Sequence, residues 1–170
     1  MTEMPKSYDK FAVETWVENA MKYFTARDFK ICSASPAGEE EKVYGYGKSV
    51  WAMIDTQSRQ PVDIFSINDG LISQYIETEK ECPIAASSRV KMSADAQLVR
   101  TIDTYYNDVD VNGHINSVKY IEHILDLFDL DYYKAHFLQR FEIAYVAESH
   151  QGDKLNFYME EVGELSLIHI

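Results

Sequence analysis

The sequence predicts an α+β fold in which strands outnumber helices. Alternating apolar and polar residues over 8–31 predict two strands, and the same pattern over 43–54 predicts a third. The apolar period changes to steps of three and four over 116–128, with Val118, Ile121, Leu125 and Phe128 on one stripe, which predicts the best-defined helix of the chain. Aromatic residues make up 13% of the sequence, and this enrichment is typical of sheets.

The predicted elements fall into two groups that are joined by a connector. We expect strands over 1–70, a connector over 71–95, and a second strand group over 96–164 that contains the 116–128 helix. Further short elements are a helix over 67–76, a helix over 131–137, and strands over 141–147 and 155–161. Because the first group lacks a convincing helix, one apolar face of its sheet is expected to be uncovered.

The charge and cysteine content exclude several classes of protein. The 170 residues carry 16 basic and 28 acidic side chains, which gives a net charge of −12. This excess of acid argues against a nucleic-acid binder and against a membrane-surface protein. The apolar runs are too short for a membrane span, and two cysteines cannot form a disulfide framework. A cytoplasmic location is therefore expected.

Polar residues concentrate in one stretch, 107–117, immediately before the 116–128 helix. One interpretation is a hairpin turn, since Asn112-Gly113 favours a type I′ turn. A second is an EF-hand-like calcium-binding loop, with Asp108, Asp110 and Asn112 at its first three ligand positions. Lys119 then stands where that loop needs a bidentate glutamate, and the preceding residues predict a strand instead of a helix.

The third interpretation is a catalytic turn that leads into a helix. Free N–H groups at a helix N-terminus, together with the Asn112 amide, would stabilise an oxyanion. His114 would transfer protons near neutral pH, and Asp110 would orient a group or assist a water molecule. The local pattern leaves the three interpretations open.

A family resemblance favours the catalytic interpretation. The run Asp108-Val109-Asp110-Val111-Asn112-Gly113-His114-Ile115-Asn116-Ser117-Val118-Lys119-Tyr120 resembles the Asp-x-Asp-x-Asn-x-His-x-Asn-x-x-Lys-Tyr signature of acyl-acyl-carrier-protein thioesterases. The runs 13–17, 49–54 and 145–149 resemble further strands of that family.

The resemblance implies a double hotdog fold, in which each antiparallel sheet wraps around a central helix. The 116–128 helix would be the central helix of the second repeat. Both repeats would then be incomplete, and we expect a chain that is truncated at both ends. Residues 165–170 match one translation of a sequencing-library adapter, so a non-native tail is expected there.

The resemblance also implies a set of catalytic residues. Asp110, Asn112 and His114 match the family's catalytic triplet, and Glu148 matches its acidic partner. Ser149 stands where the family's older assignment placed a nucleophilic cysteine, which favours attack by water in this chain.

The expected reaction is hydrolysis of a long-chain acyl-acyl-carrier-protein thioester in fatty-acid biosynthesis. The expected partner is the acylated carrier protein, no cofactor or metal is expected, and a homodimer is left open. An acyl-coenzyme A thioesterase of the same superfamily is the alternative enzyme. A fragment broken in both repeats is compatible with an inactive piece of an active enzyme.

Overall fold

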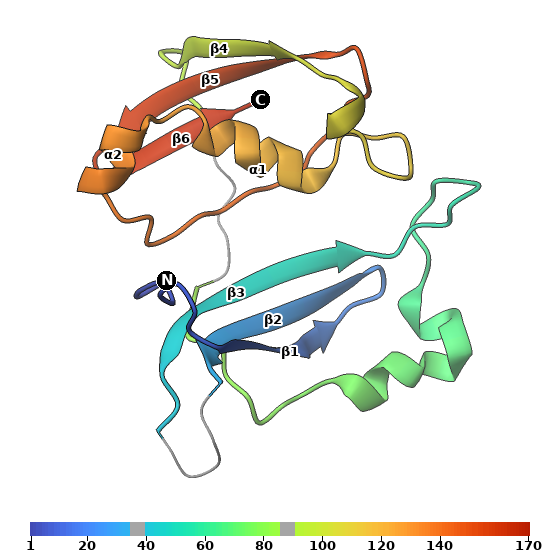
Figure 1. The fold of residues 1–170 in the computed structure, drawn as a ribbon. Helices are drawn as coiled ribbons and strands as arrows, with labels where there is room; N and C mark the ends of the chain where they lie inside the picture. The colour runs from blue at the N-terminus through green and yellow to red at the C-terminus, as the bar shows by residue number, and fades with distance from the viewer. Residues whose placement is uncertain (35–39, 86–90) are drawn as a thin grey trace. The chain divides into compact units, whose positions relative to one another are not determined.

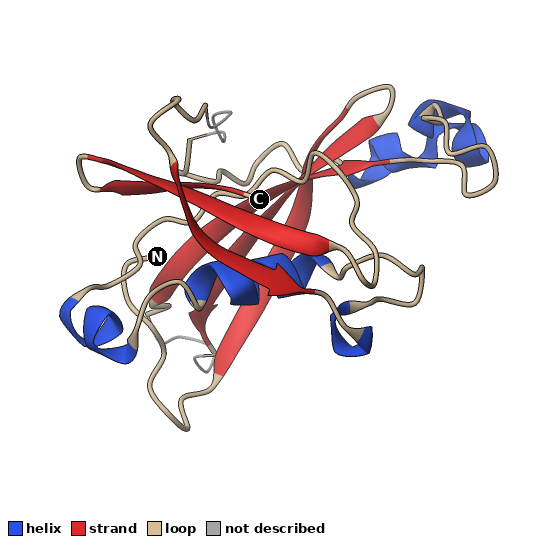
Figure 2. Ribbon diagram, turned by 90° about the horizontal axis from the view of Figure 1, so that it is seen from above, coloured by secondary structure: helices blue, strands red, loops and turns tan. Residues whose placement is uncertain are grey.

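A computed structural model describes residues 1–34, 40–85 and 91–170 of the chain. The chain divides into two compact units, Met1–Ala86 and Ser87–Ile170 (Figure 1). Each unit contains a three-stranded antiparallel sheet, and strands make up most of the regular structure (Figure 2). The predicted α+β class is therefore confirmed.

The sheet of the first unit is a simple meander with the order β1-β2-β3. Its strands are β1 (Phe11–Ala20), β2 (Phe24–Ser33) and β3 (Val43–Ala52), so all three predicted strands are confirmed. A tight turn joins the first two strands, because the backbones of Met21 and Phe24 exchange two hydrogen bonds. The pairing skips one residue between Val17 and Asn19, which is a β-bulge.

The predicted helix over 67–76 differs from the structure. The segment η1 (Ile64–Tyr75) consists of 3₁₀ turns that are interrupted by non-helical backbone. Asn68, Asp69 and Gly70 all have positive φ angles there, and such angles end a right-handed helix. The region 1–70, expected to contain only strands, thus also includes the start of η1.

One apolar face of the first sheet is open, as the sequence predicts. Phe11 and Val13 are each 55% exposed and Trp51 is 59% exposed. Their side chains lie on the same face, because the β1–β2–β3 register places alternate residues together. The first unit has no α-helix among residues 1–34 and 40–85 that could cover them.

The second unit packs one helix on its sheet. The strands β4 (Gln97–Asp103), β5 (Lys154–Val162) and β6 (Leu165–His169) pair in the order β4-β5-β6. The helix α1 (Ser117–Leu125) begins after its cap Asn116, whose side chain accepts a hydrogen bond from the Val118 N–H. The strand predicted over 155–161 is confirmed as β5, and β4 lies among the residues before the polar stretch, where a strand is also predicted.

The apolar face of α1 is rotated from the one predicted. Val118 is 54% exposed, although the spacing of three and four placed it on the buried stripe. The buried residues are Tyr120 and Ile124, which form a core cluster with Leu155 and Phe157 of β5. The large Tyr120 ring covers more of the sheet than the valine would, so it determines which side of the helix faces inward.

The strand predicted over 141–147 is absent from the structure. This segment follows the short helix α2 (Leu130–Ala135) and has no regular strand assignment. Tyr145 of this segment contacts α1: its hydroxyl donates to the Ser117 carbonyl and its ring contacts Tyr120. A strand needs a backbone ladder as well, and alternation alone does not supply a partner.

The remaining elements are short. The 3₁₀ turn η2 (Tyr106–Asp108) links β4 to the polar stretch, and the short helix expected over 131–137 corresponds to α2. Residues 165–169, within the expected non-native tail, pair with β5 as β6. None of the helices in the described parts of the chain is long and apolar enough to span a membrane.

Candidate active site

The polar stretch forms a tight five-residue turn directly before α1. In this segment, which we call the His114 turn (residues 110–114), the Asp110 N–H donates to the His114 carbonyl over 2.8 Å. Gly113 has φ 85°, whereas Asn112 does not have a positive φ, so the predicted type I′ turn is wrong. The geometry is that of a three-residue loop with glycine in the left-handed position. Val109 and Ile115 form a single antiparallel bridge at its base.

The Asp110 carboxylate organises this turn from within. Its Oδ1 accepts hydrogen bonds from the backbone N–H groups of Asn112, at 2.8 Å, and of His114, at 3.2 Å. These contacts favour the charged carboxylate and hold the pKa of Asp110 below its ordinary value, with the Asn112 N–H as the main cause. Asp110 is therefore committed to the shape of the turn.

The structure places Glu148 beside His114. Glu148 Oε2 lies 3.4 Å from His114 Nε2, and the two side chains are 52% and 25% exposed. A backbone hydrogen bond of 2.8 Å from the Ile115 N–H to the Ser149 carbonyl ties the extended segment to the end of the turn. An acid and an imidazole are thus held together by neighbouring main-chain contacts.

Asn112 lies at the exposed tip of the turn. Its Nδ2 is 3.4 Å from Asp110 Oδ2, and an amide nitrogen carries a second N–H that can donate elsewhere. At the start of α1, the Val118 N–H is already bonded to the Asn116 side chain. The helix end therefore offers fewer free donors to a substrate than the sequence alone suggests.

His150 was not among the predicted site residues. Its ring lies edge-on to the His114 ring, with centroids 5.2 Å apart and an interplanar angle of 80°. Its position two residues after Glu148 was a usable signal, because alternate residues of an extended segment point to the same side. Its backbone is fixed, since the His150 N–H donates to Asp153 and its carbonyl accepts from Thr104.

The calcium-loop interpretation gains no support from the geometry. The element before the polar stretch is β4 followed by η2, whereas an EF-hand loop needs an entering helix. Lys119 pairs with Glu122 at 2.7 Å, so the place of the bidentate glutamate is held by a cation. The described residues contain no group of three or more histidine, cysteine or acidic side chains arranged for a metal ion.

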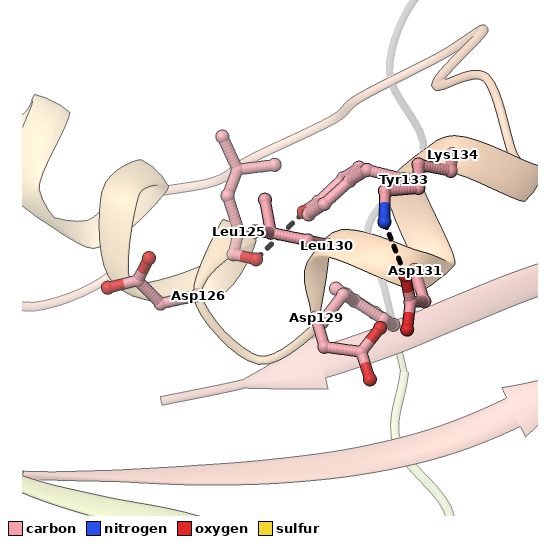
Figure 3. A pocket seen from close by; sticks show the side chains of 8 residues that line it. Leu125, Asp126, Asp129, Leu130, Asp131, Tyr133 and Lys134 are labelled. Carbon is pink, nitrogen blue, oxygen red and sulfur yellow. Dashed lines mark hydrogen bonds and ion pairs between the residues drawn. The ribbon is translucent and has the colours of Figure 1, made fainter.

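A surface hollow lies away from the His114 turn, at the junction of α1 and α2 (Figure 3). Its volume is about 660 Å³, and it is lined by residues of 125–134. The Tyr133 hydroxyl donates to the Leu125 carbonyl across it, and Lys134 pairs with Asp131 at its rim. None of the predicted site residues lines this hollow, so we do not assign it to the site.

Two family models match the chain in succession. The acyl-ACP thioesterase N-terminal domain matches residues 1–75, and the acyl-ACP thioesterase C-terminal domain matches residues 91–169. A palmitoyl-acyl carrier protein thioesterase from Gossypium hirsutum, described as chloroplastic, is 28% identical over 145 residues, which are 82% of this chain and 34% of that protein. The chain thus spans about a third of the length of this curated relative.

Solved structures agree with these matches. An acyl-ACP thioesterase from Bacteroides thetaiotaomicron is 44% identical with a TM-score of 0.82, over 96% of this chain and 63% of that one. A 12:0-ACP thioesterase from Umbellularia californica shares the fold, with 18% identity and a TM-score of 0.64, over 93% of this chain and 62% of that one.

Fold and site together define a protein of the hotdog class, with an antiparallel sheet packed on a central helix and a polar turn at the helix start. Within that class, the chain belongs to the acyl-ACP thioesterase family.

Proposed function

We propose that this chain carries the hydrolytic site of an enzyme that cleaves long-chain acyl-acyl-carrier-protein thioesters and releases free fatty acids. The observation that carries the proposal is the 3.4 Å approach of Glu148 Oε2 to His114 Nε2 beside the start of α1. A carboxylate and an imidazole at this distance can share a water molecule and move its proton.

The proposed reaction uses water as the nucleophile. Glu148 takes a proton from water while the water oxygen forms a bond to the thioester carbon, and the carbonyl electrons move onto oxygen. The free N–H of the Asn112 amide stabilises this oxyanion. The intermediate collapses, the carbon–sulfur bond breaks, and the proton that Glu148 took from water passes through His114 to the leaving thiolate. The products are a carboxylic acid and a thiol.

The remaining side chains have supporting roles in this proposal. Asp110 shapes the turn through the N–H groups of Asn112 and His114 and does not act on the water itself. The Ser149 carbonyl accepts the backbone hydrogen bond from the Ile115 N–H, and the Ser149 hydroxyl is not required for the chemistry. Hydroxyl attack would need an adjacent base to activate it.

The partner we propose is an acyl carrier protein that bears a long acyl chain, as the names of the relatives suggest. The proposed compartment is the cytoplasm, which fits the free state of Cys32 and Cys82, although the curated relative above is chloroplastic. Sedimentation of the full-length protein measures whether a homodimer forms.

The test is steady-state hydrolysis of palmitoyl-acyl-carrier protein by the full-length protein. We expect His114→Ala and Glu148→Gln each to lower kcat by about 10²–10⁴-fold, which is the usual contribution of an acid–base residue. His136→Ala is the matched control, because His136 packs on Tyr132 at the end of α2, outside the site. Ser149→Ala should retain nearly the wild-type rate.

Three outcomes would contradict the proposal. Rates near wild type in both His114→Ala and Glu148→Gln would remove these residues from the chemistry. A loss in Ser149→Ala as large as that in Glu148→Gln would indicate covalent catalysis instead of attack by water. Faster hydrolysis of palmitoyl-coenzyme A than of the carrier-bound chain would favour the alternative enzyme.

A further inference from the structure

A second acid–histidine pair lies behind the His114 turn. Asp108 Oδ1 is 3.4 Å from His123 Nε2, and both side chains are largely buried, at 11% and 19% exposure. Neither residue belongs to the set to which we assign the hydrolytic chemistry. The pair joins two elements, because Asp108 ends η2 and His123 lies in the second half of α1.

Asp108 holds the entrance and the exit of the His114 turn together. Its carbonyl accepts a 2.7 Å hydrogen bond from the N–H of Asn116, the cap of α1. Its Oδ2 accepts a 2.8 Å hydrogen bond from the Tyr105 N–H, which closes η2 from the other side. The carboxylate is thus fixed at one oxygen, and the other oxygen faces His123.

His123 is fixed from the opposite side by the core of the second unit. Its ring lies edge-on to Phe157 of β5, with centroids 6.4 Å apart, and Phe157 is fully buried. Within the described residues, His123 Nε2 is buried and has no partner in hydrogen-bond geometry. A buried ring nitrogen of this kind costs free energy unless a polar group faces it, and Asp108 Oδ1 is at ion-pair distance.

Other charges face the same carboxylate. Lys119 lies one turn before His123 on α1, and its hydrogen bond to Glu122 raises its pKa. The negative charge of Asp108 adds to that shift. The carboxylate of Asp108 therefore faces Lys119 and the His123 ring on α1, whereas Asp110 faces the backbone of the turn.

We propose that Asp108 and His123 are positioning residues, which set the His114 turn at a fixed angle to α1 and so keep His114 within reach of Glu148. This inference rests on the proposed function for its kinetic consequence, but the fixed turn can be measured without it. A displacement of about 1 Å in a catalytic group can lower a rate by about 10²-fold. Loss of the Asp108–His123 contact is therefore expected to have a large effect on turnover.

The experiment compares four variants of the full-length protein. His123→Leu removes the polar ring nitrogens, whereas His123→Gln keeps a polar side chain of similar reach. Asp108→Asn removes the charge with little change of shape, and it tests the pair if His123→Leu does not fold. His136→Leu is the control, since it makes the same replacement on α2 away from the pair.

Amide hydrogen exchange is the first measurement. In His123→Leu we expect the N–H groups of Asp110 and Asn116 to exchange at least about tenfold faster, as in local opening. The amides of β5 should keep their wild-type rates, and His123→Gln should restore slow exchange in the turn. Wild-type exchange at Asp110 and Asn116 in both His123→Leu and Asp108→Asn would overturn the inference, as would an equal acceleration throughout β5.

Turnover of palmitoyl-acyl-carrier protein is the second measurement. We expect His123→Leu to lower kcat by about 10- to 100-fold with little change in KM, because the turn and not the acyl-binding surface has moved. His123→Gln should recover most of that loss. If the wild-type protein is inactive but the His114 turn opens in His123→Leu, the result contradicts the proposed function and supports the positioning role of Asp108 and His123. If the wild-type protein is active and the turn is unchanged in His123→Leu, the result supports the proposed function and contradicts the positioning role.

Discussion

The two sheets of this chain have the same number of strands and differ in what covers them. In the second unit, α1 packs on the sheet and leaves Leu155 and Phe157 at 3% and 0% exposure. In the first unit, Val13 and Trp51 remain 55% and 59% exposed. Strand patterns alone therefore do not make a core, because an apolar face contributes stability only when another element removes it from water.

The two units also differ in how the surroundings of an aspartate shift its pKa. Asp28 in the middle of β2 is 1% exposed, and neither of its carboxylate oxygens has a hydrogen-bond partner among the described residues. Burial raises its pKa, with a further contribution from Glu18, against the attraction of Lys48. Asp110 in the second unit shows the opposite direction, because backbone N–H groups stabilise its charge.

The largest expected effect is on the free energy of unfolding, and it tests the packing of α1 on the second sheet. Phe157→Ala should lower the free energy of unfolding of the second unit by about 3–5 kcal/mol, because it leaves a cavity under α1. Phe11→Ala is the matched change in the first unit, and it should cost less than about 0.5 kcal/mol at an exposed site. Urea denaturation of the full-length protein measures both. Losses of similar size would mean that Phe11 is buried too and would break the comparison.

The next effect concerns the buried carboxylate of the first unit. A carboxyl group with a raised folded pKa contributes stability below its ordinary value of 3.8 and loses it as the pH rises through the folded pKa. The buried carboxyl group therefore contributes less stability at pH 7 than at acid pH, and Asp28→Asn should raise the free energy of unfolding at pH 7 by about 1 kcal/mol.

Thermal unfolding at two pH values checks this prediction. The gain in Tm from Asp28→Asn should be present at pH 7 and absent near pH 3, where the acid is neutral. Glu81→Gln likewise neutralises a carboxylate, at an exposed position of the first unit, and should leave Tm unchanged. A lower Tm for Asp28→Asn at pH 7 would show that the Lys48 contact outweighs the cost of burial.

The smallest effect is a difference in titration between the two aspartates. A carboxyl group with a lowered folded pKa contributes stability above its ordinary value of 3.8 and loses it as the pH falls through the folded pKa. Carboxyl ¹³C NMR should give a midpoint below 3.8 for Asp110 and above 3.8 for Asp28. The Asn112 and His114 amides should lose protection over the Asp110 titration. Midpoints in the reverse order would contradict the assigned causes.

The sequence predicts those parts of the fold that depend on local rules. Strands β1 to β5 and the α1 helix follow from apolar periodicity, and the helix begins after Asn116, a residue type whose side chain can accept from a free N–H. The face that α1 buries was predicted one position away, because the size of Tyr120 and not the spacing decides the packing.

Long-range contacts account for what the sequence does not predict. Segment 141–147 has strand-like alternation, but its contacts are with Ser117 and Tyr120 instead of a neighbouring ladder. His123 has no motif around it, and only the fold brings its ring to Asp108. The approach of Glu148 to His114 followed from family resemblance, since residues 34 positions apart carry no local signal of contact.

The tether between Ile115 and Ser149 uses main-chain atoms on both sides. Any residue with an ordinary peptide group at position 149 can therefore keep the turn and the extended segment joined. The side chain at this half-buried position, next to Glu148, could carry a hydroxyl, a thiol or a methyl group without loss of the backbone hydrogen bond. The position of the backbone and the chemical nature of the side chain at 149 can therefore change independently. A substitution there can introduce a different reactive group while the backbone stays in place.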